Sequence, residues 1–166
     1  RNKLNFHWAL EALEENSYSS KDDISDETTL SKTLDDATDD TSAHNQSSIV
    51  FLLETDEKQK FLFTGDAGRD AFNHVPQTLL GKVKDVTWMK VPHHGSKHNL
   101  DSTIIKHVNP EIAYISTEKQ GKYLNRSTVF ALKKNGTKVY STSQNRSTIR
   151  HGAIKTREGW TKIEPM

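Results

Sequence analysis

The stretch "VTWMKVPHHGSKHNLDSTIIKHVNPEIAYIST" at residues 86–117 contains a strand pattern, a helix pattern and a second strand pattern in succession. The runs 86–92 and 111–117 are rich in apolar, β-branched and aromatic residues, which favour strands. Between them, 100–108 carries apolar residues at helical spacing. A strand, a helix and a strand in this order predict an α/β fold in which helices pack on a sheet.

The same patterns continue on both sides of this stretch. Further strands are expected at 47–55, 60–66, 137–142, 147–156 and 159–165, and further helices at 5–16, 69–81 (interrupted near Pro76) and 126–136. Asp101 or Ser102 is the expected cap of the helix at 100–108, and Ser127 or Thr128 is expected near the cap of the helix at 126–136. The first of these strands is almost continuously apolar, which is typical of a strand buried on both faces. We expect it to form a hairpin with the second, and the last two strands to form a closing hairpin.

The composition divides the chain into three parts. Residues 1–16 are expected to hold an N-terminal helix. Residues 17–44 are expected to be an acidic, flexible insertion, because they contain eight acidic residues and few large apolar ones. Such a segment does not bury enough surface to offset the entropy lost on ordering. Residues 45–166 carry the remaining strand and helix patterns and form the expected folded domain.

The composition also excludes several classes of protein. Of the 166 residues, 33% are hydrophobic, and no apolar run approaches the ~20 residues of a membrane span. The absence of cysteine excludes disulfides and thiolate metal sites and fits a reducing compartment such as the cytoplasm. Residues 81–166 carry 16 basic and 6 acidic side chains. This half either attracts an anionic partner such as nucleic acid or is a solvated, lysine-rich face.

Two polar turns with the same design follow predicted strands. Asp66 comes after Gly65 at the end of one strand, and His93 and His94 precede Gly95 at the end of another. Ligands and catalytic groups collect at strand ends in layered α/β folds. A carboxylate together with imidazoles suits Zn²⁺, Mn²⁺ or iron. Considered separately, either turn can equally be an ordinary polar loop.

Taken in order, these motifs resemble a known family. "TGDA" (64–67), "VPHHGS" (91–96) and the Asn-x-Ser-Ser at 45–48 are similar to the C-terminal half of the metallo-β-lactamase superfamily. Within it, they resemble the branch with the hydrolase domain of competence-type DNA-uptake membrane proteins. The resemblance covers about 45–155 and implies half of an αββα sandwich, a mixed sheet with outer helices. The N-terminal half of the same domain is then an expected partner.

The resemblance also implies roles for individual residues. Asp66 matches a catalytic carboxylate that bridges two metals, His94 matches a ligand of the second metal, and His93 would face the substrate as a catalytic residue. The opposite assignment of the two histidines stays open, because a slip of one residue at a strand end exchanges the sides that they face. The candidate substrate-binding residues are Lys97, His98 and Asn125. Two divalent ions, Zn²⁺ or Mn²⁺, are expected in the complete protein.

The implied function is hydrolysis of a phosphodiester or nucleic-acid-like substrate by a metal-activated hydroxide. However, the His-x-His-x-Asp-His motif of the family's first metal site does not occur in this sequence. Because the chain begins with Arg1, we expect it to be the C-terminal piece of a longer enzyme. The alternatives are an inactive binding module with the same fold, or an esterase or lactonase, since a fold does not determine the substrate.

Overall fold

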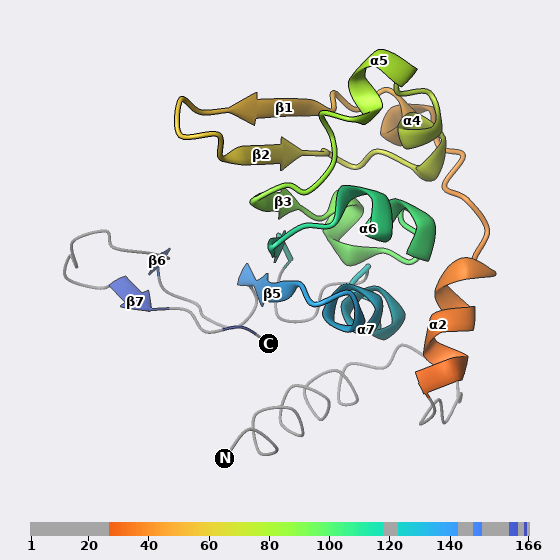
Figure 1. Cartoon of the computed structure of the whole chain (residues 1–166). Coiled ribbons are helices and arrows are strands. Elements are labelled where there is room, and N and C mark those ends of the chain that lie inside the picture. Colours follow the sequence, from red (N-terminus) through yellow and green to blue (C-terminus); the bar gives the residue numbers. More distant parts are fainter. Residues whose placement is uncertain (1–26, 118–122, 143–147, 151–159, 163–164, 166) are drawn as a thin grey trace.

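The computed structural model describes residues 27–117, 123–142, 148–150, 160–162 and 165. It confirms the α/β class, with five strands in one sheet in the order β1-β2-β3-β4-β5 (Figure 1). The helix predicted within 1–16 lies outside the described residues. Within them, no helix combines the length and apolar composition that crossing a lipid bilayer requires.

The sheet is mixed, as expected. Its strands are β1 (Phe51–Glu54), β2 (Lys60–Phe63), β3 (Trp88–Lys90), β4 (Ile112–Ile115) and β5 (Lys138–Ser141). The predicted hairpin is confirmed, because β1 pairs antiparallel with β2. The pairs from β2 to β5 are all parallel, so the polar turns that follow β2, β3 and β4 lie at one edge of the sheet.

The predicted closing hairpin was wrong. β6 (Thr148–Arg150) and β7 (Trp160–Lys162) form a separate two-stranded sheet, but they run parallel rather than antiparallel. Alternation along a strand has the same period of two residues in both arrangements. The sequence pattern therefore reveals a strand but not its direction relative to a neighbour.

The helices occur largely where the sequence predicted them. They are α2 (Glu27–Asp35), α3 (Ala43–Gln46), α4 (Arg69–Asn73), α5 (Gln77–Leu80), the 3₁₀ turn η1 (Pro92–Gly95), α6 (Ser102–Val108) and α7 (Arg126–Lys134). The break near Pro76 is confirmed, since that residue precedes α5. Asp101 caps α6 by accepting a hydrogen bond from the backbone N–H of Ile104 at 2.7 Å. The cap of α7 is Asn125, whose side chain accepts from the N–H of Ser127, so Ser127 lies near the cap as expected.

The hydrophobic core lies between the helices and one face of the sheet. In β2 to β5, alternate residues point into it and are buried: Leu62, Met89, Ala113, Ile115 and Val139. Ile105 of α6 and Leu132 of α7 pack against these side chains and are also buried. The period of two along each strand thus separates a core face from an opposite face.

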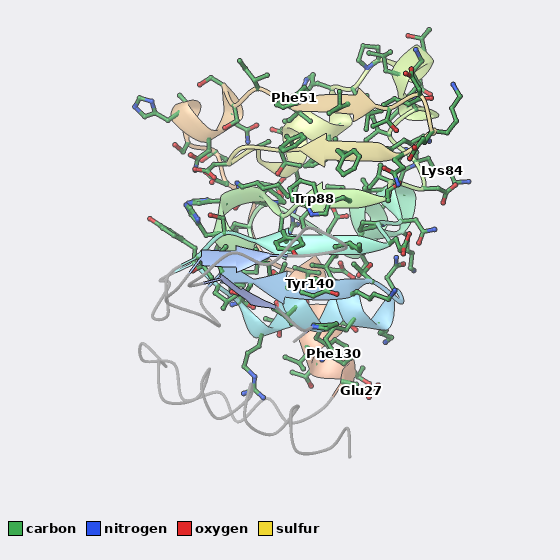
Figure 2. All side chains as sticks on the ribbon, turned by 90° about the vertical axis from the view of Figure 1, so that its left-hand side faces the viewer. Glu27, Phe51, Lys84, Trp88, Phe130 and Tyr140 are labelled. Atoms are coloured by element: carbon green, nitrogen blue, oxygen red, sulfur yellow. The ribbon has the colours of Figure 1, made fainter. Side chains whose placement is uncertain are left out.

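Aromatic side chains cross the opposite face of the sheet, which Figure 2 views from the side of Phe51, Trp88 and Tyr140. We call the row Phe51, Phe63, Trp88, Tyr114 and Tyr140 the aromatic face. Consecutive ring centroids along it are 4.6, 5.1, 5.6 and 5.1 Å apart. Burial, and then the neighbouring Tyr140, raise the pKa of Tyr114 to about 12. The rings therefore form one continuous row, which is exposed at Phe51 and buried at Tyr140.

This surface corrects the prediction that the strand within 47–55 is buried on both faces. In β1, Phe51 is 51% exposed and Leu53 is 52% exposed, and Ile49 just before the strand is 79% exposed. β1 is an edge strand of the five-stranded sheet. An apolar run indicates that both faces of a strand favour burial. It does not show that other described residues pack on both faces.

Residues 27–44 of the expected flexible insertion are among the described residues. α2 lies beside α7 (Figure 1), and Leu34 of α2 is fully buried in the core. Only Leu30 and Leu34 are large apolar residues in this helix, and their spacing of four places both on one side. Leu34 and the hydrogen bonds from Ser102 to the carboxylate of Asp35 together hold a helix that is otherwise polar. Residues 17–26 lie outside the described residues, and the division of the chain at residue 44 stays a prediction.

Candidate functional site

The candidate site lies where the loops after β2 and β3 meet. Gly65 has a φ of +55°, and the backbone N–H of Asp66 donates to Oγ of Ser48 at 3.1 Å. A Cβ at Gly65 would lie 3.0 Å from Cβ of Ser48, so glycine permits this close approach. The backbone N–H of His93 donates to the carbonyl of Gly65 at 3.3 Å. This bond joins the two predicted turns.

The histidine turn has an unusual backbone. His93, His94 and Gly95 have φ values of +41°, +56° and +87°. A left-handed conformation at a residue other than glycine costs on the order of 1–3 kcal/mol, and it persists only where the surroundings enforce it. Such residues cluster at functional sites. The strained backbone therefore marks this turn as a candidate functional element, held in place by the contacts of its two imidazoles.

His93 lies in a polar cluster that we call the Asp40 network, made of Asp40, Asn45, His93 and Asn99. Nδ1 of His93 is 3.1 Å from Oδ2 of Asp40, 3.2 Å from Oδ1 of Asn99 and 3.4 Å from Nδ2 of Asn45. The side chains of His93 and Asp40 are only 15% and 11% exposed. The network therefore holds the imidazole in an environment largely closed to water.

Asp40 belongs to the segment between α2 and α3, which the sequence had indicated to be flexible. Its carboxylate accepts hydrogen bonds from Nδ2 of Asn45 at 2.6 Å and from the backbone N–H of Ser42 at 2.9 Å. Burial alone would raise the pKa of Asp40, but the hydrogen bonds from Asn45, Ser42, Asn99 and His93 together hold this pKa below its usual value. The carboxylate is thus stabilised in its charged form beside His93.

Asn99 is a residue that sequence reasoning missed. It is fully buried, and its Nδ2 donates to the carbonyls of Asp66 at 3.1 Å and Ala67 at 3.2 Å, and to Oδ2 of Asp40 at 3.2 Å. It therefore connects the Asp66 turn to the histidine turn. An asparagine in a polar loop normally lies in water, so nothing local in the sequence indicated its burial.

His94 points away from the Asp40 network. Its Nδ1 lies within hydrogen-bond distance of the carbonyl of Ser116, which directly follows β4. The ring of Tyr123 is 4.3 Å from the ring of His93 and 6.0 Å from that of His94. Both imidazoles and the tyrosine ring thus form one group at the strand ends.

The carboxylate of Asp66 is paired with a lysine. Nζ of Lys90 lies 3.3 Å from Oδ1 of Asp66 and also donates to the carbonyl of Gly65. The side chain of Asp66 is 38% exposed. Across the described residues, no three histidine, aspartate or glutamate side chains are grouped closely enough to hold a metal ion. The turns of Asp66 and His93 are adjacent, but they do not form a complete metal site.

The three candidate substrate-binding residues have different surroundings. Nδ1 of His98 lies 2.7 Å from the carbonyl of Thr38, and its own carbonyl accepts from the N–H of Asp40, so His98 holds the segment before α3. Oδ1 of Asn125 accepts from the N–H of Ser127 at 2.9 Å as the cap of α7. No hydrogen bond of the Lys97 side chain is found among the described residues. Contact of these three with substrate stays a prediction.

Arg69 is a second buried residue that the sequence did not single out. It is 7% exposed, and its guanidinium donates to the carbonyls of Leu34, Lys97 and Leu100 at 2.8, 2.9 and 3.1 Å. Its Nε also lies 3.2 Å from Oδ1 of Asp39. Arg69 therefore ties the end of α2 to the loop that follows the histidine turn.

The comparisons with known proteins give one relative. The chain is 30% identical over 128 residues to ComE operon protein 3 of Bacillus subtilis (strain 168), and the match covers 76% of this chain. The same match covers 16% of that relative, so the chain spans only a small part of its length. No protein-family model matches the chain, and no solved structure does. The chain is therefore similar to one part of a much longer ComE operon protein.

Proposed function

We propose that this chain is the C-terminal half of a metal-dependent hydrolase of the metallo-β-lactamase type, acting on a phosphodiester. One observation carries the proposal: His93 and His94 both turn Nδ1 toward an acceptor of the protein, Asp40 or Ser116. Neither Nε2 has a hydrogen-bond partner among the described residues. Histidines that bind a metal usually donate their other ring N–H to a carboxylate or a carbonyl in this way.

The donor set of this chain fits part of such a site. Asp66 offers a half-exposed carboxylate, and the two Nε2 atoms offer neutral lone pairs. A catalytic zinc needs about three protein ligands, and two ions sharing a bridging carboxylate need more than these residues supply. The remaining ligands would come from the N-terminal half, in which the family carries its His-x-His-x-Asp-His motif.

Within the complete site, each residue would have a separate task. Two divalent ions, when bound, supply a hydroxide nucleophile at neutral pH and polarise the phosphoryl oxygens. Asp66 would bridge the ions and His94 would bind the second one. His93, held by the Asp40 network, would face the substrate or serve as the ligand instead. Lys97 and His98 lie in the loop that follows the histidine turn, and Asn125 lies directly before α7.

The aromatic face supports the expectation of an N-terminal half. A row of five rings on one side of the sheet, ending at the exposed Phe51, is the kind of surface that a second sheet covers. In the αββα sandwich, two such faces pack against each other. We therefore expect the N-terminal half to bury the aromatic face.

The phosphodiester assignment depends on the resemblance to the branch of DNA-uptake proteins and on the basic charge of residues 81–166. It is tested by hydrolysis of bis-p-nitrophenyl phosphate by the complete protein with Mn²⁺ or Zn²⁺. Asp66→Ala should abolish this activity, whereas Asp70→Ala, an exposed carboxylate four residues away, should retain it. Activity of the complete protein on carboxylic esters but not on phosphodiesters would refute the assignment.

A second candidate function is an inactive binding module. The contact of Lys90 with Asp66 favours it, because an ammonium group next to this carboxylate already supplies the positive charge that a metal would provide. Calorimetric titration of the complete protein with Zn²⁺ or Mn²⁺ separates the two functions. Binding of two ions with loss in Asp66→Ala supports the hydrolase, and absence of binding supports the module.

A further inference from the structure

The amide of Asn99 can adopt only one orientation. Three oxygen atoms surround its Nδ2: the carbonyls of Asp66 and Ala67, and Oδ2 of Asp40, at 3.1, 3.2 and 3.2 Å. Turning the amide over would place its own oxygen against these three acceptors. Because Asn99 is fully buried, no water could then separate the oxygen atoms. Two of the three are backbone carbonyls, which accept hydrogen bonds but never donate them. Oδ1 of Asn99 must therefore face His93.

This orientation determines which ring nitrogen of His93 carries the proton. Nδ1 lies 3.2 Å from Oδ1 of Asn99 and 3.1 Å from Oδ2 of Asp40, and both of these oxygens accept. The third neighbour, Nδ2 of Asn45 at 3.4 Å, is a donor, but it lies only 2.6 Å from Oδ2 of Asp40 and donates there. An unprotonated Nδ1 would face two acceptors within a closed environment, which is unfavourable.

We propose that Asp40 and Asn99 are positioning residues that hold His93 in the tautomer with its proton on Nδ1, so that Nε2 presents its lone pair to the candidate site. The use of that lone pair, for a metal ion or for a proton of the substrate, rests on the proposed function. The tautomer itself does not, because it follows from protein contacts alone.

The segment before α3 must be ordered for Asp40 to reach His93 and Asn99, which lie far away along the chain. Asp40 and Asn99 are 59 residues apart, and His93 has a strained backbone with φ +41° and ψ +52°. A Cβ at Gly68 would lie 2.9 Å from the carbonyl of Asp40, so the segment packs directly against the start of α4. The hydrogen bonds of the Asp40 network offset the strain at His93 and place its ring.

The test is the ¹⁵N spectrum of the 166-residue chain labelled with ¹⁵N-histidine, recorded by magic-angle spinning, which does not require a monomer. At a pH of about 8.5, well above the usual histidine pKa of ~6.5, neutral rings show separate signals for protonated and unprotonated nitrogen. The chain has 8 histidines, so the signals of His93 are assigned by their loss in His93→Gln. We expect a single tautomer for His93, with Nδ1 protonated and Nε2 unprotonated.

Two variants test the assigned roles, and one variant is the control. Asp40→Ala and Asn99→Ala should each produce a mixture of both tautomers at His93, because each removes an acceptor from Nδ1. Asp36→Asn removes an exposed carboxylate from the same segment and should leave the ring unchanged. If Asn99→Ala does not fold, as judged by circular dichroism, Asp40→Ala decides the outcome.

Either of two results overturns the proposal. One is a wild-type His93 with its proton on Nε2 or shared between both nitrogens. The other is an unchanged tautomer in the folded Asp40→Ala variant. No metal ion and no substrate are present in this experiment. A failure of the proposed hydrolysis is therefore distinguishable from a failure of the tautomer assignment.

Discussion

Replacing Leu34 by alanine tests whether α2 is part of the folded core. The side chain of Leu34 is fully buried between α2 and the rest of the core, and its carbonyl accepts a hydrogen bond from Arg69. Replacing a buried leucine by alanine lowers the free energy of unfolding by about 2–5 kcal/mol. The lower part of this range applies where neighbouring side chains can collapse into the cavity. Because α2 is a single helix next to α7, we expect a loss of roughly 2–3 kcal/mol in the free energy of unfolding.

Urea denaturation followed by circular dichroism measures this loss. A domain of this size has a total stability of about 5–15 kcal/mol, so the shift of the midpoint should be easily measured. Lys32→Ala, an exposed substitution in the same helix, is the matched control and should change stability by less than about 0.5 kcal/mol. Equal stabilities of Leu34→Ala and Lys32→Ala would refute the docking of α2. Rapid hydrogen exchange of all amides in 27–35 of the wild type would refute it independently.

Two further perturbations test the histidine turn and the aromatic face. Gly95→Ala forces a Cβ onto a residue with φ +87°, only 3.1 Å from Cδ1 of Leu124, and should cost about 1–2 kcal/mol in urea denaturation. Gly81→Ala, which has no atom within 4 Å of the new Cβ, should cost nothing, and equal costs would contradict this reasoning. The chain alone should self-associate through its aromatic face, and the exposed pair Phe51→Glu and Leu53→Glu should shift it toward monomer in sedimentation velocity. A wild-type chain that stays monomeric would argue against a half-domain.

Much of the fold could be predicted because its signals are local. The run of apolar residues at β3, the helical spacing of α6 and the cap at Asp101 each depend on residues within a few positions of one another. The break at Pro76 has the same origin, since proline lacks the N–H that an α-helix needs. Local signals do not reveal direction, and β6 and β7 were therefore paired with the wrong orientation.

The candidate site was only partly predictable. The turns at Asp66 and His93 were identified because glycine and polar residues follow apolar strands, and the structure places these turns side by side. Asp40, Asn99 and Arg69 were missed, because an isolated polar residue in a loop is usually solvated. The burial of Arg69, for example, depends on carbonyls that lie 28 or more positions away along the chain.

By itself, the order of residues determined which segments become strands and helices and where the turns with glycine and histidine fall, because these depend on short-range sterics and on the period of apolar side chains. Only the tertiary structure decided that Asp40 and Asn99 meet at Nδ1 of His93, and that one face of the sheet carries a row of rings. The physical reason is that a buried polar group must find a partner wherever packing places one, and that partner need not be near in the chain.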